Sequence, residues 1–267
     1  MHSTYILIDT ALLGELRNKP WLKKKRRPSW ITPVYPRYAV EVSPVVIDIE
    51  RAIQCSRTHV MMELVNAQLP QLGVSVIETD LTFEDVVTHL RKFIYVCTES
   101  GVELTLRFAD SAVLPALASI LSPEQWTLIT APFRSWKIHG RDGKLMTLPI
   151  VDQTSSVELP LMLSGAQIIA LKDTMGADQL LINLRIRRPA SSSEYCTSQA
   201  YTYAAQARHM WHAAGHSDDL DLVDFAGKVF DTEGKLLRSP RLAEILAQTD
   251  RSQMRQAIQQ IVAHQCS

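Results

Sequence analysis

Three groups of residues have side chains that could bind a ligand or take part in chemistry. The first is a set of three histidines, His209, His212 and His216, at spacings of three and seven residues. Such spacings can bring imidazoles to one face of a helix, as in a metal site. Gly215, however, is expected to end that helix before His216. We therefore expect polar positions at a helix end, where histidine also suits the helix dipole, and no metal site.

Arg107 and Asp110 form the second group, at the end of an expected strand over Glu103–Phe108. Catalytic residues of α/β folds often follow strands, so this pair could belong to a non-standard active site. The alternative is structural: an ion pair or a turn anchor, with Asp110 capping a helix that starts near Ser111. We favour the structural interpretation.

The third group is a basic segment near the N-terminus. The whole chain balances 28 Lys+Arg against 28 Asp+Glu in 267 residues, but residues 16–40 contain eight basic residues and no acidic one. The rest of the chain therefore carries the compensating negative charge, which excludes a generally basic nucleic-acid binder. Inside the segment, five consecutive basic residues lie between two tryptophans.

This segment could be a solvated loop, a surface that steers an acidic protein partner, or a contact with nucleic acid or a membrane. Tryptophan, tyrosine and arginine are enriched in the hot spots of protein interfaces, which makes these residues the best candidates for partner binding. The candidate partner-binding residues are Trp21, Lys23, Lys24, Lys25, Arg26, Arg27, Trp30, Tyr35, Arg37 and Tyr38.

Familiar catalytic fingerprints are missing from the sequence, among them glycine-rich phosphate loops, the nucleophile elbow and the zinc-protease helix motif. The four cysteines are far apart and form no CxxC pair, so neither a disulfide framework nor a zinc site is expected. We find neither a secretory signal nor a run of roughly 18 apolar residues. The sequence thus predicts a cytoplasmic protein without a membrane span, metal, cofactor or enzymatic activity.

The elements that must position these residues fall into two parts. In the first part, strands are expected at Tyr5–Asp9, Ser43–Ile49, Ile94–Cys97 and Glu103–Phe108. Helices are expected after the capping residues Thr82 and Ser122. A hairpin is expected from Phe133–His139 and Lys144–Leu148, with Gly143 in its turn.

In the second part, strand signals almost vanish. Helices are expected from Ser164 to Gly176, from Ser191 to about Ala214, and over Ser239–Gln248 and Asp250–His264. The predicted fold class is α+β or α/β, with an N-terminal mixed lobe over residues 1–150 and an all-helical C-terminal lobe over residues 151–267.

Several segments, taken in order, resemble the bacterial type VI secretion adaptor chaperones, a family formerly described as a domain of unknown function. The segments are residues 5–12, 72–96, 106–126, 133–148, 163–171 and 205–231. The strand-end signature of that family is Arg-Phe-Tyr-Asp, whereas this chain has Arg107-Phe108-Ala109-Asp110. The family-motif positions Arg107 and Asp110 are kept, but no role of the tyrosine can be carried over.

The resemblance implies a non-catalytic adaptor that binds a toxic effector, by its N-terminal region, and loads it onto the C-terminal region of a VgrG spike protein. The basic, proline-rich residues 20–38 would then be a local elaboration that selects the cargo. Two other classes stay open. One is a nucleic-acid-binding module that uses residues 17–37, and the other is an enzyme with a non-standard site near Arg107 and Asp110.

Overall fold

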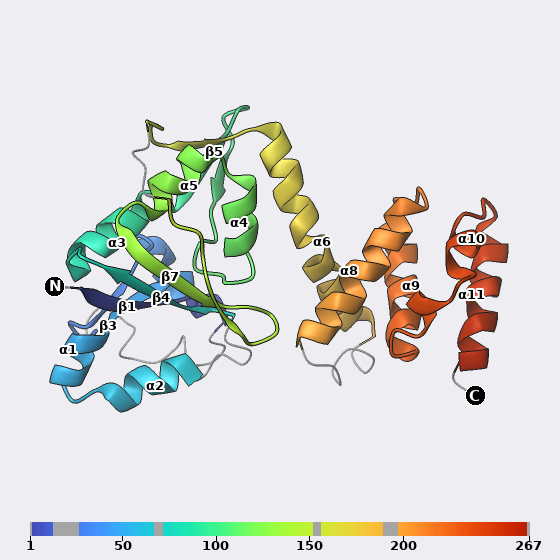
Figure 1. Ribbon diagram of the computed structural model, residues 1–267, viewed down its shortest axis with the longest axis horizontal. Coiled ribbons are helices and arrows are strands. Elements are labelled where there is room, and N and C mark those ends of the chain that lie inside the picture. Colours follow the sequence, from blue (N-terminus) through green and yellow to red (C-terminus); the bar gives the residue numbers. More distant parts are fainter. Residues whose placement is uncertain (1, 13–26, 67–71, 152–155, 189–196, 266–267) are drawn as a thin grey trace. The chain divides into compact units, whose positions relative to one another are not determined.

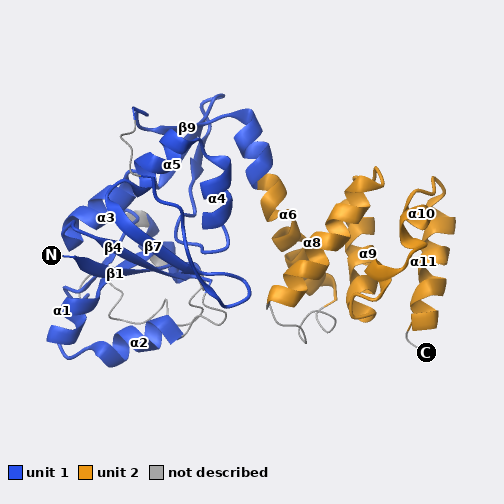
Figure 2. Cartoon of the chain, in the orientation of Figure 1, with its two compact units in different colours: residues 1–171 blue, residues 172–267 orange. Residues whose placement is uncertain are grey.

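The computed structural model describes residues 2–12, 27–66, 72–151, 156–188 and 197–265, apart from the side chains of Leu12, Arg37, Tyr38, Glu41 and Thr197 (Figure 1). The chain divides into two compact units, residues 1–171 and 172–267 (Figure 2). The first unit combines two sheets with helices, and the described part of the second is helical. This is the α+β arrangement that the sequence predicts.

The division between the units lies after Leu171, whereas the sequence analysis placed it at residue 150. Strand β9 (Leu161–Leu163) explains the difference, because it pairs in parallel with β5 (Tyr95–Thr98) and completes a sheet of the first unit. Helix α6 (Gly165–Arg187) then runs from the first unit into the second.

The larger sheet of the first unit has six strands in the order β2-β3-β1-β4-β7-β8, and all its neighbours are antiparallel. Its strands are β1 (Ser3–Ile8), β2 (Ile31–Pro33), β3 (Val45–Asp48), β4 (Val74–Thr79), β7 (Phe133–His139) and β8 (Leu145–Thr147). The expected strands near the start of the chain and the expected hairpin are thus confirmed. Gly143 adopts a φ of 77° in the hairpin turn, a conformation that favours glycine.

Both faces of this sheet are buried around β1 and β3, which explains the continuous apolar run in β1. Tyr5 and Leu7 belong to a core cluster on one face, whereas Ile6 and Ile8 belong to a second cluster on the other. The first cluster includes residues of α3 (Phe83–Arg91), α4 (Leu114–Ile120) and α5 (Pro123–Thr130). The second includes residues of α1 (Ile49–Gln54) and α2 (Thr58–Asn66), below the sheet in Figure 1.

The capping residues predicted for α3 and α5 are confirmed. The Thr82 hydroxyl accepts a hydrogen bond from the Asp85 N–H. Ser122 and Gln125 form a complete capping box, in which each side chain bonds the main chain of the other. These caps satisfy N–H groups that the first turn of a helix leaves without a partner.

His89 in α3 is a partly buried titratable group, and it predicts a pH dependence of stability. Its Nε2–H donates to the Ile129 carbonyl at 2.8 Å, and its ring meets the edges of Phe93 and Phe133. Burial lowers the pKa of His89 below its ordinary value near 6.5. Between the folded and unfolded pKa values the unfolded chain binds more protons, so stability falls as the pH falls below about 6.5.

We expect the wild type to lose more stability between pH 7.5 and pH 5.5 than the variant His89→Gln, which keeps an N–H donor for Ile129 but does not titrate. Urea unfolding at the two pH values measures this difference. Equal losses in the two proteins would show that His89 does not titrate between folded and unfolded states.

The smaller sheet of the first unit has the order β6-β5-β9. Strand β6 (Glu103–Thr105) is shorter than the expected Glu103–Phe108, and its three residues are exposed. Beyond Thr105 the chain turns into the core: Leu106 and Phe108 are buried, while Leu104 is 38% exposed. The alternation of apolar residues therefore predicted the presence of a strand correctly, but it did not predict that the strand ends at Thr105.

The second unit contains most of α6 together with α8 (Thr197–Ala213), α9 (Asp219–Asp231), α10 (Leu242–Leu246) and α11 (Arg251–Gln265). Helix α8 ends before Gly215, as expected, and the φ of this glycine is 86°. The two helices expected near the C-terminus are present as α10 and α11, although α10 is shorter than the expected Ser239–Gln248. The start expected at Ser191 lies outside the described residues. Helix α9 was not predicted, although Asp218 caps it by accepting from the Leu220 and Asp221 N–H groups.

Gly176 does not end α6, which continues to Arg187. A Cβ atom at position 176 would lie 2.3 Å from Nε of Arg208, so glycine lets this guanidinium lie against the helix backbone. There Arg208 forms an ion pair of 2.6 Å with Asp173. Gly176 thus allows α8 to approach α6 closely, and it does not end the helix.

Candidate functional site

The strand-end pair Arg107 and Asp110 lies beside Asp9, the residue that follows β1. One guanidinium nitrogen of Arg107 is 2.8 Å from a carboxylate oxygen of Asp9 and 3.3 Å from one of Asp110. The side chains of Asp9 and Asp110 are 6% and 13% exposed, whereas that of Arg107 is 51% exposed. The arginine therefore bridges two largely buried carboxylates at the rim of the unit.

Both carboxylates also accept main-chain hydrogen bonds. Asp110 accepts from the Ala112 N–H, and Asp9 accepts from the Ala11 N–H, each at 2.9 Å. The predicted ion pair and turn anchor at Asp110 are thus confirmed. The predicted helix cap is wrong, because the bond to Ala112 closes a turn and α4 begins only at Leu114.

Burial shapes the electrostatics of this cluster. It raises the pKa of Asp110 above its ordinary value, although the charge of Arg107 opposes the shift. Burial alone would lower the pKa of Arg107, but the hydrogen bond to Asp9 and the charge of Asp110 raise it above its ordinary value. Burial and the charge of Asp9 likewise raise the pKa of Tyr35. The two carboxylates thus favour the charged form of Arg107.

The main chain around the cluster joins separate segments of the unit. The Asp9 N–H donates to the Gly73 carbonyl at 2.8 Å, and the Ser111 N–H donates to the Leu72 carbonyl at 2.7 Å. Ala109, which stands where the resembling family has tyrosine, is buried in the first core cluster. These contacts give the Arg107–Asp110 turn a structural role that ties β1, β4 and α4 together.

The candidate residues of the basic segment do not form one described surface. Trp21, Lys23, Lys24, Lys25 and Arg26 lie outside the described residues, as do the side chains of Arg37 and Tyr38. Arg27 is partly buried, and this burial lowers its pKa. Tyr35 is partly buried against the first core cluster.

Trp30 is a core residue, so its predicted role as an exposed interface anchor is wrong. Its side chain is 1% exposed and belongs to the second core cluster. Its carbonyl accepts from the Asp48 N–H at 2.8 Å, next to the pairing of β2 with β3. Burial of a large aromatic side chain outweighs the charge of its neighbours in the sequence.

Two of the three histidines, His212 and His216, form hydrogen bonds within the fold of the second unit. The ring of His212 hydrogen-bonds to the His216 carbonyl at 2.9 Å, and the ring of His216 hydrogen-bonds to the Leu246 carbonyl at 2.6 Å. His209 and His212 line a cavity of about 430 Å³ beside Arg208. In the part of the chain that the structure describes, no group of three or more His, Cys, Asp or Glu residues is placed to hold a metal ion.

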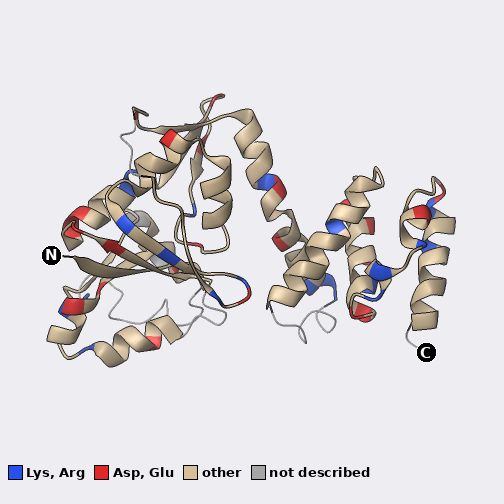
Figure 3. Ribbon diagram, in the orientation of Figure 1, with Lys and Arg blue, Asp and Glu red and all other residues tan. Residues whose placement is uncertain are grey.

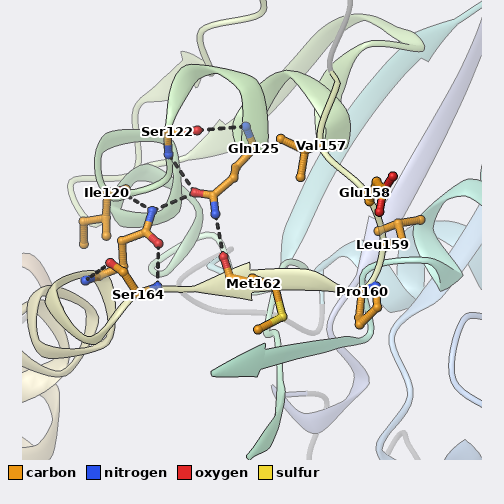
Figure 4. Close-up of a pocket in the computed structure, with 10 residues that line it drawn as sticks. Ile120, Ser122, Gln125, Val157, Glu158, Leu159, Pro160, Met162 and Ser164 are labelled. Carbon is orange, nitrogen blue, oxygen red and sulfur yellow. Dashed lines mark hydrogen bonds between the residues drawn. The ribbon is translucent and has the colours of Figure 1, made fainter. Parts of the chain in front are cut away.

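A groove in the first unit was missed by the sequence analysis. It has a volume of about 680 Å³ and lies along β9, the edge strand of the smaller sheet (Figure 4). We call it the β9 groove. It is lined by Ile120, Ser122, Gln125, Val157, Glu158, Leu159, Pro160, Met162, Ser164 and Gln167.

Two capping boxes meet at one wall of the β9 groove. Gln125 caps α5, and Gln167 caps α6 by accepting from the Ser164 N–H at 3.0 Å. The Gln167 amide donates to the Gln125 amide oxygen at 2.7 Å, and Gln125 donates to the Met162 carbonyl at 2.6 Å. The repeated Ser-x-x-Gln spacing was visible in the sequence as two helix starts. What it could not show is that the two glutamines join each other across 42 residues.

The comparison with protein families matches part of the first unit. Residues 4–128 match the family described as "Domain of unknown function (DUF4123)". No curated protein and no solved structure matches the chain. The DUF4123 region runs from β1 into α5, so it contains Asp9, Arg107 and Asp110 as well as the α5 wall of the groove.

Charge and hydropathy of the described residues add two observations. Lys and Arg are interspersed with Asp and Glu on the described helices of both units (Figure 3). None of the helices in the described ranges is long and apolar enough to cross a membrane.

Proposed function

We propose that the protein is a non-catalytic adaptor that binds a type VI secretion effector and loads it onto the tip of a VgrG spike. The observation that carries this proposal is the DUF4123 match over residues 4–128. It falls on the segments whose order resembles the type VI adaptor chaperones, and that resemblance continues to residue 231. The effector would be bound by its N-terminal region, and the spike by its C-terminal region.

The geometry of the strand-end cluster favours binding over catalysis. Arg107 is held by Asp9 and Asp110, and both carboxylates accept main-chain hydrogen bonds. A catalytic acid or base must reach a reacting group, but these side chains are engaged with each other and with the main chain. The cluster supports a scaffold whose function lies in its surfaces.

In this proposal the basic residues Lys23–Arg27 steer an acidic cargo. Charge complementarity between partners mainly raises the association rate and the selectivity, and it weakens as salt is added. The adaptor would act in the bacterial cytoplasm and would remain there after the effector is delivered.

Co-expression tests the proposal. The tagged chain is expressed with the products of the genes that flank its own, and we expect it to retain at least one effector or spike protein through purification at 0.5 M salt. Retention at this concentration separates a protein complex from nucleic-acid binding, whose affinity falls steeply with salt. Folded chain that retains neither product would contradict the proposal.

A further inference from the structure

We propose that the β9 groove binds an extended peptide segment of a partner protein, in which apolar side chains alternate with basic ones. This segment is separate from the acidic surface that Lys23–Arg27 would steer. The inference rests on the proposed function, because it assumes that the ligand is a segment of a protein. It is carried by the edge strand, the exposed apolar side chains and the charge of the groove.

The edge strand supplies a main-chain donor. Among the strands that the structure describes, β9 has a neighbour, β5, on one side only. Figure 4 shows the Gln125 amide reaching the Met162 carbonyl from the groove, at 2.6 Å. The N–H and C=O of a strand residue point to the same side, so the Met162 N–H also faces the groove. An extended peptide that lies along β9 can accept this bond through one of its carbonyl groups.

The apolar part of the groove lies next to that donor. Leu159 is 44% exposed and Met162 is 45% exposed, both large for apolar side chains. Ile120 and Val157 also line the groove and are partly buried. Apolar side chains on one face of an extended peptide recur at every second residue, so several of them can contact this surface together.

The charge of the groove determines which residues are favoured between the apolar residues of the bound peptide. Glu158 is exposed and is the charged residue among the ten that line the groove. Two more carboxylates bond its walls: Glu124 accepts from the Ser122 hydroxyl, and Glu99 accepts from the Gly165 N–H. The lining residues include no Lys or Arg. Charge complementarity therefore favours a basic segment over an acidic one.

Two fluorescent hexapeptides test the inference: Leu-Lys-Leu-Lys-Leu-Lys and its acidic counterpart Leu-Glu-Leu-Glu-Leu-Glu. We expect saturable binding of the basic peptide to the full chain by fluorescence anisotropy and much weaker binding of the acidic one. Glu158→Lys should weaken the binding of the basic peptide about tenfold at 50 mM salt. The matched control is Glu103→Lys, which reverses an exposed charge on the opposite edge strand of the same sheet and should change binding less than twofold.

A second pair of variants tests the main-chain bond. Met162→Pro removes the N–H that faces the groove, whereas Met162→Ala keeps it and removes the side chain. We expect the proline variant to bind about fivefold more weakly than the alanine variant, the effect of one hydrogen bond. Thermal unfolding shows whether both remain folded. If the proline variant does not fold, the comparison of Glu158→Lys with Glu103→Lys tests the inference.

Equal binding of the two peptides, or equal effects of Glu158→Lys and Glu103→Lys, would overturn the inference. Repeating the co-expression with Glu158→Lys separates it from the proposed function. A partner retained by the wild type and equally by this variant overturns the groove and leaves the adaptor function standing. A wild type that binds the basic peptide but retains no partner removes the adaptor function and leaves a peptide-binding groove.

Discussion

Replacing Trp136 with alanine is expected to lower the free energy of unfolding of the first unit by about 4 kcal/mol. Trp136 is fully buried, and it stacks on Trp126 with ring centroids 6.4 Å apart and meets the edge of Phe133 at 5.3 Å. Its indole N–H donates to the Ser75 hydroxyl at 3.0 Å. Alanine would leave a cavity between β7 and α5 and deprive that buried hydroxyl of its partner.

Urea unfolding followed by circular dichroism measures the loss. Trp136→Phe is the matched control, because it keeps an aromatic ring and removes the hydrogen bond, and it should cost about 1–2 kcal/mol. The second unit has its own core, so its transition should not move. A loss below about 1 kcal/mol for the alanine variant would contradict the central place of Trp136 in the core.

Replacing Arg107 with methionine is expected to cost about 2 kcal/mol of stability. The variant leaves Asp9 and Asp110 without their shared cation, and both carboxylates are largely buried. Removing one partner of a buried ion pair costs about 3–5 kcal/mol, but the guanidinium is half exposed and partly screened by water, which reduces the estimate.

A second substitution shows whether electrostatics cause that loss. Arg107→Met with Asp110→Asn should recover part of the stability, because one of the two facing carboxylates is then neutral. The folded pKa of Asp110 is already raised in the wild type, and it should rise further without Arg107. A carboxyl with a raised folded pKa binds more protons when folded, so the single variant should approach the wild type as the pH falls towards 5.

Partner retention by the Arg107 variants distinguishes a scaffold role from a contact role. We expect the single variant to retain its partner at a temperature where it is folded. Unchanged stability together with a lost partner would instead place Arg107 in the binding surface.

Local signals in the sequence were sufficient for much of the first unit. The Ser122-to-Gln125 spacing predicts a helix start, and Thr82 with the apolar stripe after it predicts α3, because caps and helical periodicity depend on neighbours in the chain. The strand over β1 was equally clear. These features need no knowledge of the rest of the fold.

Features that depend on distant residues could not be predicted. Trp30 lies beside a basic run, but its burial is set by β3 and by the helices under the sheet. Gly176 is a helix breaker by type, and only the position of Arg208 explains why it stands inside α6. Asp9, which forms an ion pair with Arg107, is 98 residues away from it in the sequence. The β9 groove likewise requires segments from two helices and a strand edge.

Loading of the effector onto the spike is the central claim, and a three-component capture experiment tests it most directly. Purified VgrG is immobilised, and purified effector is added with and without this chain. We predict that the effector is captured on the spike only when the chain is present, and that the chain itself binds the effector in solution. Capture that is equal without the chain, or absent with it when all three proteins are folded, would contradict the account.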